Sequence, residues 1–339
     1  MESLYYIDAY ACWKLQRLFY QVPGSEWVAI AISTLGDPKI CYLLAFPVAF
    51  FINRKLGSQM LCIIAWAEWL NIVLKWLLLG ERPYWWVHTN SDWPSDQTIH
   101  QVYITCETGP GVPSGHVMIT GCVWWTIANY ISQLNKNRPL SNIIKPLTAV
   151  FIMLVLISRV LIACHFIHQV LLGLVVVILL SAAYGHLNTW LGEASFGILF
   201  MMSLCAGFGS FFIYYVWIWL GFDPSFSIPL AEKYCADHTW VHLDSTPYLS
   251  VMRSSGSLFG LAICKLIQQY VKLSKLSTSS QLTPSSVILT IVVLYLWNSV
   301  PMAGAQISHI LFYTMSFIRY AMLPFLVTMF VPLCTQTSL

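Results

Sequence analysis

Apolar runs of about 20 residues recur along almost the whole chain, and they constrain its fold more than any other feature. A helix of this length is needed to cross the hydrocarbon core of a bilayer. Charged residues make up only 9% of the 339 residues, whereas soluble domains carry about 25%. The sequence therefore predicts an all-α polytopic membrane protein, because helices satisfy their own backbone hydrogen bonds in lipid.

About nine such runs can be delimited, and we expect each to form one transmembrane helix. Their approximate limits are residues 39–53, 58–79, 115–134, 146–163, 166–187, 196–220, 255–272, 286–303 and 307–333. A further apolar segment, 26–36, either extends the first helix or lies at the membrane surface, and Pro38 favours a break after it. We expect a single integral membrane domain over 1–339, with the catalytic core at about 58–187 and C-terminal helices at about 196–333.

Basic residues concentrate in alternate loops, which indicates the orientation of the chain. The loops with this excess contain Arg54, Lys55, Lys136, Arg138, Lys145, Lys272 and Lys275. The positive-inside rule places these loops in the cytosol. An odd number of spans then puts the N terminus on the non-cytosolic side and the C terminus in the cytosol. The net charge of +3 is small, and no basic block suggests nucleic acid as a partner.

Three short polar clusters interrupt the apolar chain. They are Lys75 with Arg82-Pro83, the run Pro113-Ser114-Gly115-His116, and Ser158-Arg159 with His165. All three fall at the predicted non-cytosolic ends of helices. Together they offer three cations and two imidazoles, the groups that bind a phosphate and transfer protons while its ester bond breaks. A lysine inside a span either faces a polar cavity or reaches out to the membrane surface.

The spacing within the clusters sets conditions on their geometry. Lys75 and Arg82 are seven residues apart, so on one helix they would face the same side, about 10 Å apart along the axis. Arg159 and His165 are six residues apart and would face nearly opposite sides of a continuous helix. They converge only if one helix ends near Arg159 and the next begins near His165. Gln169 then lies on the face of His165 and could orient its imidazole.

Ser114 and Gly115 precede an apolar run, where the N terminus of a helix is expected. Ser114 could cap this helix, and free backbone N–H groups there favour an anion. Gly115 would let the backbone approach a ligand closely. Metal ligation by His165 and His168 is the alternative use of the histidines, but no carboxylate or cysteine cluster accompanies them.

The ten cysteines are scattered without a fixed spacing. Most lie inside apolar runs, where a thiol behaves as a small hydrophobic group. Cys106 and Cys235 lie in polar loops and could pair, although we expect two free thiols.

Taken together, the three clusters resemble the three-part signature of the type 2 phosphatidic acid phosphatase superfamily. The segments around them resemble the glucose-6-phosphatase catalytic subunits over most of the chain. These segments are Glu68-Trp69-Leu70-Asn71, Arg82-Pro83-Tyr84-Trp85-Trp86-Val87-His88, Cys106-Glu107-Thr108-Gly109-Pro110-Gly111, His165-Phe166-Ile167-His168-Gln169 and Trp240-Val241-His242-Leu243-Asp244-Ser245. The run Leu35-Gly36-Asp37-Pro38-Lys39-Ile40 and the lack of an Asn-x-Ser/Thr sequon are most similar to the third catalytic subunit of this family.

This resemblance implies a phosphatidic-acid-phosphatase-type helical core in the endoplasmic reticulum membrane. It implies metal-independent hydrolysis of glucose 6-phosphate, or of a related sugar-alcohol phosphate, at a lumenal site that serves glucose metabolism and gluconeogenesis. His165 would attack phosphorus and form a phosphohistidine, and His116 would protonate the leaving oxygen. The residues implied to bind the phosphate are Lys75, Arg82, Arg159, Ser114 and Gly115. No cofactor is implied, and the implied partners are membrane lipids and a separate glucose-6-phosphate transporter.

The residues that contact the sugar are less defined. Glu107 lies in the loop before His116, and Asp37 lies at the expected helix break. Either carboxylate could accept hydrogen bonds from sugar hydroxyls or could serve as a turn or cap residue. Gln169 stands where the superfamily usually has an aspartate, so His165 lacks a charged partner at that position.

Two other functions fit the same motifs. A lipid phosphate phosphatase would use the same site, although nine spans and tryptophan-rich loops favour the sugar-phosphate branch. A phosphate-ester transporter or a catalytically silent binding protein would also need an anion site, but the complete set of catalytic motifs argues against it.

Overall fold

The computed structural model describes residues 2–134, 139–242, 245–270, 283–300 and 308–336. Within these residues the chain is helical, and an isolated β-bridge joins Glu107 to His242. The chain divides into two compact units. Unit 1 comprises Met1–Pro38, Leu70–Ser181 and Ile213–Pro247, and unit 2 comprises Lys39–Trp69, Ala182–Phe212 and Tyr248–Leu339. All of the predicted site residues belong to unit 1.

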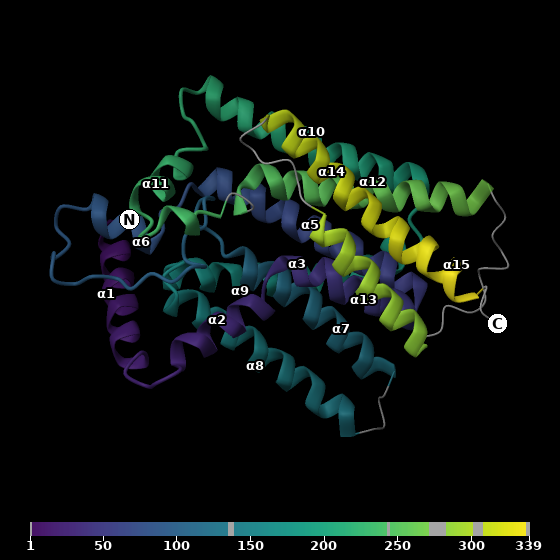
Figure 1. Ribbon diagram of the computed structural model, residues 1–339, viewed down its shortest axis with the longest axis horizontal. Coiled ribbons are helices and arrows are strands. Elements are labelled where there is room, and N and C mark those ends of the chain that lie inside the picture. Colours follow the sequence, from purple (N-terminus) through teal and green to yellow (C-terminus); the bar gives the residue numbers. More distant parts are fainter. Residues whose placement is uncertain (1, 135–138, 243–244, 271–282, 301–307, 337–339) are drawn as a thin grey trace. The chain divides into compact units, whose positions relative to one another are not determined.

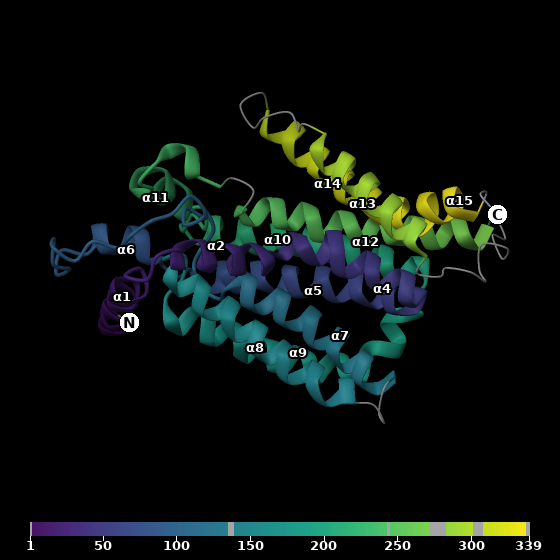
Figure 2. The ribbon, with the colours of Figure 1, turned by 60° about the horizontal axis from the view of Figure 1, so that its bottom comes forward.

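Unit 1 contains helices that pack side by side, as α7 and α8 do (Figure 1). Its elements are α1 (Glu2–Phe19), α2 (Ser25–Leu35), the end of α5 (Arg54–Leu78), α6 (Pro83–Thr89), η2 (His116–Thr120), α7 (Gly121–Leu134), α8 (Pro139–Leu161), the start of α9 (Ile167–Gly192), the end of α10 (Phe196–Trp219), α11 (Ser227–Tyr234) and η3 (His238–Trp240). Helix α8, labelled in Figure 2, also contacts α1 and α2. Gly121 lets α9 approach α7, because a Cβ there would lie 2.6 Å from the side chain of Val177.

Unit 2 contains the remaining helices. They are α3 (Pro38–Ile40), η1 (Cys41–Ala45), α4 (Phe46–Ile52), the start of α5, the end of α9, the start of α10, α12 (Pro247–Tyr270), α13 (Pro284–Ser299), α14 (His309–Phe325), η6 (Leu326–Phe330) and α15 (Val331–Gln336). A buried ion pair joins Glu68 of α5 to Arg253 of α12, and the Tyr42 hydroxyl donates to the same carboxylate at 2.7 Å. Such pairing offsets the free energy needed to place charged groups inside a membrane.

Five helical stretches are long and apolar enough to cross a bilayer, by length and composition. Their bounds are Arg54–Thr89, Asn142–Leu161, Ile167–Leu187, Phe196–Trp219 and Ile310–Thr335. A sixth arises if Ser25–Leu35 and Pro38–Ile52 form one broken span, and the break between them lies where Pro38 predicts it. The structure therefore confirms a helical protein with several candidate spans, but it does not confirm nine.

Four predicted spans are not among these five, and one of them, 39–53, enters only as part of the broken span. Residues 115–134 form η2 and helix α7, and this segment includes the polar residues His116, Asn129 and Gln133. Helix α12 mixes Arg253 and several serines with its apolar residues, and α13 has only 16 residues. The basic loops at 135–138 and 271–282 lie outside the described residues, so the orientation of the chain stays a prediction.

Candidate active site

A turn, and not a shared helix face, brings Lys75 and Arg82 together. Helix α5 ends at Leu78, and Leu79 adopts a left-handed conformation with φ of 48°. Arg82 is extended, with φ of −120° and ψ of 153°, because the proline that follows disfavours helical geometry. Lys75 and Arg82 therefore do not share one helix, but their charges still interact electrostatically.

Arg82 is fully buried and connects two loops of unit 1. Its Nε donates to the carbonyl of Gly109 at 2.6 Å, and its Nη2 donates to that of Pro110 at 3.3 Å. Its Nη1 donates to the carbonyl of Cys164 at 3.0 Å and lies 2.9 Å from Oε2 of Glu107. Arg82 therefore fixes the loops around the site and also supplies a positive charge inside it.

A tight turn after α8 brings His165 back to Arg159. Helix α8 ends at Leu161, and Ala163 adopts a left-handed conformation with φ of 58°. The backbone carbonyl of Arg159 accepts hydrogen bonds from the N–H groups of Cys164 at 3.2 Å and His165 at 3.3 Å. The helix break required by the six-residue spacing is thus confirmed.

The hydrogen bonds of Gln169 fix the tautomer of His165. The amide Nε2 of Gln169 donates to the carbonyl of Glu81 at 2.6 Å, so its Oε1 faces the N–H of Phe166 and Nδ1 of His165, each at 3.2 Å. Nδ1 also lies 2.8 Å from the carbonyl of Gly111. Because both neighbours of Nδ1 are acceptors, Nδ1 carries the proton and Nε2 presents a lone pair.

His165 lies in the loop between α8 and α9 and is completely buried. Burial, followed by the charges of Arg82 and Arg159, lowers the pKa of its imidazole well below the usual range. The ring is therefore neutral at physiological pH, which is the form that can act as a nucleophile.

The carboxylate of Glu107 lies at the centre of the cluster. Nη2 of Arg159 binds its Oε1, and Nη1 of Arg82 binds its Oε2 at 2.9 Å. Nδ1 of His116 lies 3.7 Å from Oε1, and Nε2 of His165 lies 4.0 Å from Oε2. Burial would raise the pKa of Glu107, but the guanidinium groups of Arg159 and Arg82 hold it well below its usual range. We call this arrangement the anion site, and an ionised carboxylate occupies it.

Lys75 and Asp37 border the anion site. Lys75 is buried on α5 and interacts electrostatically with both guanidinium groups. Asp37 follows the end of α2 and interacts electrostatically with His116 and Arg159. Sequence reasoning missed Ser33, whose hydroxyl accepts a 2.7 Å hydrogen bond from Nη1 of Arg159. A serine on an apolar helix gives no signal of such a contact.

Ser114 and Gly115 lie next to the site, at the start of the helical segment formed by η2 and α7. The N–H of Ser114 already donates to the carbonyl of Gln169 at 3.2 Å. The helix begins at Gly115, and the carbonyl of Ser114 accepts from the N–H of Met118 at 3.0 Å. Ser114 therefore precedes the helix as predicted, but its hydroxyl has no hydrogen-bond partner among the described residues and does not cap the helix. A Cβ on Gly115 would lie 3.0 Å from Oδ1 of Asn71, so the lack of a side chain here lets Asn71 of α5 pack closely.

Three buried polar atoms of the site have no hydrogen-bond partner among the described residues. They are Oγ of Ser114, Nε of Arg159 and Nε2 of His165. An unsatisfied buried polar group costs about 1–3 kcal/mol, so an arrangement of several such groups indicates a place for a ligand. The hydroxyl and the guanidinium can donate to phosphoryl oxygens, whereas the Nε2 lone pair can attack phosphorus.

His165 and His168 bind separate partners and do not form a ligand pair in the structure. Nδ1 of His168 lies 2.6 Å from Oδ2 of Asp8, and the backbone N–H of His168 donates to the same oxygen at 2.9 Å. Gln16 also donates to the carbonyl of Leu161 at 2.7 Å. Helix α1 thus supports the loop that carries His165.

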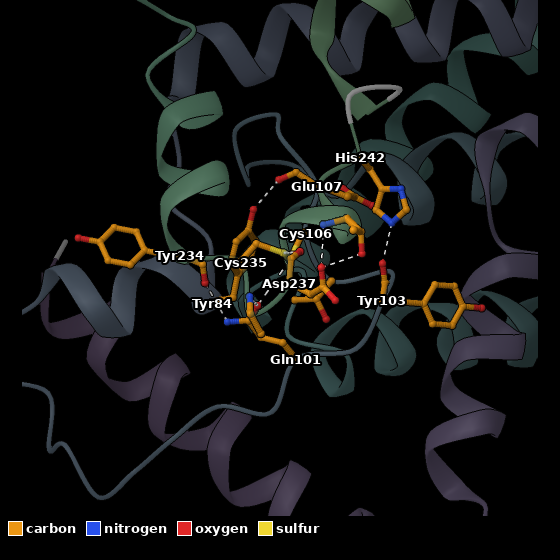
Figure 3. The surroundings of a disulfide bond; sticks show 12 residues. Tyr84, Gln101, Tyr103, Cys106, Glu107, Tyr234, Cys235, Asp237 and His242 are labelled. Atoms are coloured by element: carbon orange, nitrogen blue, oxygen red, sulfur yellow. Dashed lines mark hydrogen bonds between the residues drawn. A yellow bond between two sulfur atoms is a disulfide. The ribbon is translucent and has the colours of Figure 1, made fainter. Parts of the chain in front are cut away.

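A disulfide holds the loop that carries Glu107. Cys106 and Cys235 are bonded across 129 residues, with their Cα atoms 5.8 Å apart (Figure 3). The expectation of two free thiols is therefore wrong, because the fold brings together loops that are distant in sequence. Beside the disulfide, the N–H of His242 donates to the carbonyl of Cys106 at 3.0 Å, and the Tyr84 hydroxyl donates to that of Glu107 at 2.8 Å.

Replacing Cys235 by serine is expected to lower the free energy of unfolding by about 2–4 kcal/mol, because the disulfide closes a long loop. Thermal unfolding of the purified protein, with and without a reductant, measures this effect. Reductant should lower the thermal unfolding midpoint of the wild type to that of C235S, and it should leave the midpoint of the variant unchanged. C205S, which alters an exposed free cysteine, is the control. Equal midpoints for wild type and C235S without reductant would contradict the expectation.

Gly111→Ala should displace the group that orients His165. A Cβ there would lie 2.2 Å from the carbonyl oxygen of Glu81 and 2.7 Å from both amide atoms of Gln169, so the backbone must move. We expect kcat to fall about 100-fold, since the Gly111 carbonyl accepts the hydrogen bond from Nδ1–H that orients the nucleophile. Steady-state kinetics of G111A measure this fall in kcat.

Gly185→Ala is the matched control, because a Cβ on that helical glycine meets nothing within 4 Å and should leave kcat unchanged. Equal kcat values for G111A and the wild type would refute the role of this carbonyl.

Comparison with known proteins agrees with this geometry. Residues 56–193 match the model of the PAP2 superfamily. The chain is 38% identical over 335 residues to glucose-6-phosphatase 3 of Mus musculus, covering 95% of this chain and 93% of the relative. It is 34% identical to glucose-6-phosphatase 2 of Homo sapiens, covering 89% and 88% of the two chains. Glucose-6-phosphatase catalytic subunit 1 of Felis catus is 32% identical, with coverages of 92% and 89%.

No solved structure matches the chain significantly. The family match and the apolar helices define a multi-pass membrane phosphatase of the PAP2 superfamily. Within it, the chain belongs to the glucose-6-phosphatase family.

Proposed function

We propose that this protein hydrolyses hexose 6-phosphates, or a related sugar-alcohol phosphate, to the free sugar and inorganic phosphate. The observation that carries the proposal is the anion site, where two buried guanidinium groups lie beside a neutral and oriented His165 with a free Nε2 lone pair. The sugar part of the substrate is inferred from the relatives, which are named glucose-6-phosphatases.

The proposed reaction has two steps. Nε2 of His165 attacks phosphorus, the bond between phosphorus and the ester oxygen breaks, and His116 gives its proton to the departing oxygen. Water then attacks the phosphohistidine while His116 removes its proton, and the P–N bond breaks to release phosphate. Lys75, Arg82 and Arg159 stabilise the charge on the phosphoryl oxygens in both steps. The two guanidinium groups, together with Lys75, supply the charge that a metal ion would otherwise provide.

We also propose that the site faces the lumen of the endoplasmic reticulum. The distribution of basic residues supports a non-cytosolic position for the loops of the site. The disulfide next to Glu107 supports the same side, because disulfides persist in oxidising compartments. A substrate made in the cytosol would then need a separate transporter to reach the site.

Hydrolysis by the purified full-length protein tests the proposal. The substrates are glucose 6-phosphate, an anhydrohexitol phosphate and phosphatidic acid, each assayed with and without EDTA. We expect phosphate release from the sugar phosphates in both conditions. Release from phosphatidic acid alone would indicate a lipid phosphatase, and binding without release would indicate a transporter or a binding protein. Loss of activity in EDTA would show that a metal ion takes part.

A further inference from the structure

An ionised carboxylate of the protein itself occupies the anion site. Glu107 contacts both guanidinium groups, and one histidine lies within 4.0 Å of each of its oxygens. Its side chain is only 12% exposed. Because the cations of the site are buried, they need a counter-ion when no substrate is bound, and Glu107 provides it. The sequence predicts that this carboxylate either accepts from sugar hydroxyls or serves as a turn or cap residue, and neither role is that of a counter-ion.

A bound phosphoryl group would need the same donors. Arg82 and Arg159 each direct one N–H group at an oxygen of Glu107, and Nε2 of His165 faces that carboxylate. A carboxylate and a phosphate that share these donors would repel each other strongly in a buried site. The two anions therefore exclude each other, and the carboxylate must leave before phosphorus can approach His165.

The main chain at Glu107 cannot move far, so the side chain must rotate. The carbonyl of Glu107 accepts from Tyr84, and its N–H donates to Thr105 at 2.8 Å. The neighbouring residue Cys106 is fixed by the disulfide in Figure 3, and the N–H of Thr108 donates to Oγ of Ser245 at 2.9 Å. A glutamate has rotatable bonds that can swing its carboxylate away without moving this backbone. The displaced carboxylate would then be free to accept a hydroxyl of the substrate.

We propose that Glu107 is a displaceable counter-ion that selects the charge of the substrate. This inference rests on the proposed phosphatase function and adds a specificity determinant to it. A phosphomonoester carries two negative charges at neutral pH, so its exchange for one carboxylate gains attraction to the buried cations. A phosphodiester carries one negative charge, like the carboxylate, so exchanging the two adds no attraction to the buried cations. Glu107 thereby admits monoesters and excludes diesters.

Binding of two anions tests the proposal without requiring turnover. Inorganic phosphate and dimethyl phosphate are added to the purified full-length protein, and the rise in the unfolding midpoint gives each dissociation constant. Phosphate should stabilise the wild type, whereas dimethyl phosphate should not. In Glu107→Gln the amide no longer competes, so the dissociation constant of phosphate should fall at least about tenfold, and dimethyl phosphate should now bind. The affinity for phosphate rises because, in the wild type, the protein's own carboxylate occupies the site and leaves it only fractionally available to the ligand.

Two further variants complete the test. Glu68→Gln removes a buried carboxylate that pairs with Arg253 and has no described contact with the residues of the anion site, and it should leave both dissociation constants unchanged. If E107Q does not fold, Glu107→Asp serves instead, because a carboxylate one methylene shorter cannot reach both guanidinium groups and should also let phosphate bind more tightly. Unchanged or weaker phosphate binding in the Glu107 variant, or continued exclusion of dimethyl phosphate by E107Q, would overturn the proposal. A wild type that binds phosphate but cleaves no sugar phosphate would overturn the proposed function alone.

Discussion

His165→Ala is expected to abolish hydrolysis while the protein still folds. The imidazole is the one oriented nucleophile that the described residues place beside the anion site, with its Nε2 lone pair directed at the bound carboxylate. Loss of a covalent nucleophile typically removes several orders of magnitude from the rate, so kcat should fall by at least about 10⁴-fold. The measurement is phosphate release from glucose 6-phosphate by the purified variant.

Two observations separate a chemical defect from a folding defect in H165A. The variant should still be stabilised by inorganic phosphate, because Arg82 and Arg159 remain in place. His100→Ala changes an exposed histidine paired with Glu26 and should keep wild-type turnover. Normal turnover in H165A would refute the nucleophile, whatever the stability of the variant.

Arg82→Ala is expected to lower both turnover and stability. The guanidinium contacts the carboxylate of Glu107 and also the carbonyls of Gly109, Pro110 and Cys164, all inside the protein. Its removal leaves these acceptors and an anion without a partner, which costs about 3–5 kcal/mol of unfolding free energy. Turnover should fall at least about 10³-fold through the lost stabilisation of phosphoryl charge.

Arg159→Ala is the matched comparison for R82A. The Arg159 side chain contacts Ser33 and Glu107 and holds no backbone carbonyl among the described contacts. Its loss should reduce turnover to a similar degree but lower the unfolding midpoint less than R82A does. Thermal unfolding and phosphate release are measured on both variants. Equal destabilisation by the two substitutions would contradict the structural role assigned to Arg82.

The membrane class and the residues of the site could be predicted from the sequence because both signals are local. Apolar runs of helical length reveal a membrane protein, and motif spacing singles out Arg82, His116, Arg159 and His165. The break between Arg159 and His165 also follows from helix geometry, since no continuous helix could bring them together. The number of spans could not be fixed, because hydropathy alone does not show where a helix ends, as the short length of α13 illustrates.

The features that the sequence did not reveal depend on contacts between distant segments. Glu107 reaches the two arginines only after separate loops have folded together, and nothing in its local pattern separates that role from a turn or a sugar contact. The partner of Cys106 is likewise set by the fold and lies 129 residues away. The Gly111 carbonyl explains how His165 is oriented without an aspartate, but a backbone atom leaves no mark in a side-chain motif.

Trapping of the covalent intermediate tests the central claim most directly. The purified protein is mixed with glucose 6-phosphate that carries a labelled phosphate, and the reaction is stopped with alkali during turnover. We expect the label on the protein in an acid-labile and alkali-stable bond, located by mass spectrometry at His165, and absent from H165A. Label at another residue, or rapid turnover with no labelled protein, would contradict the account.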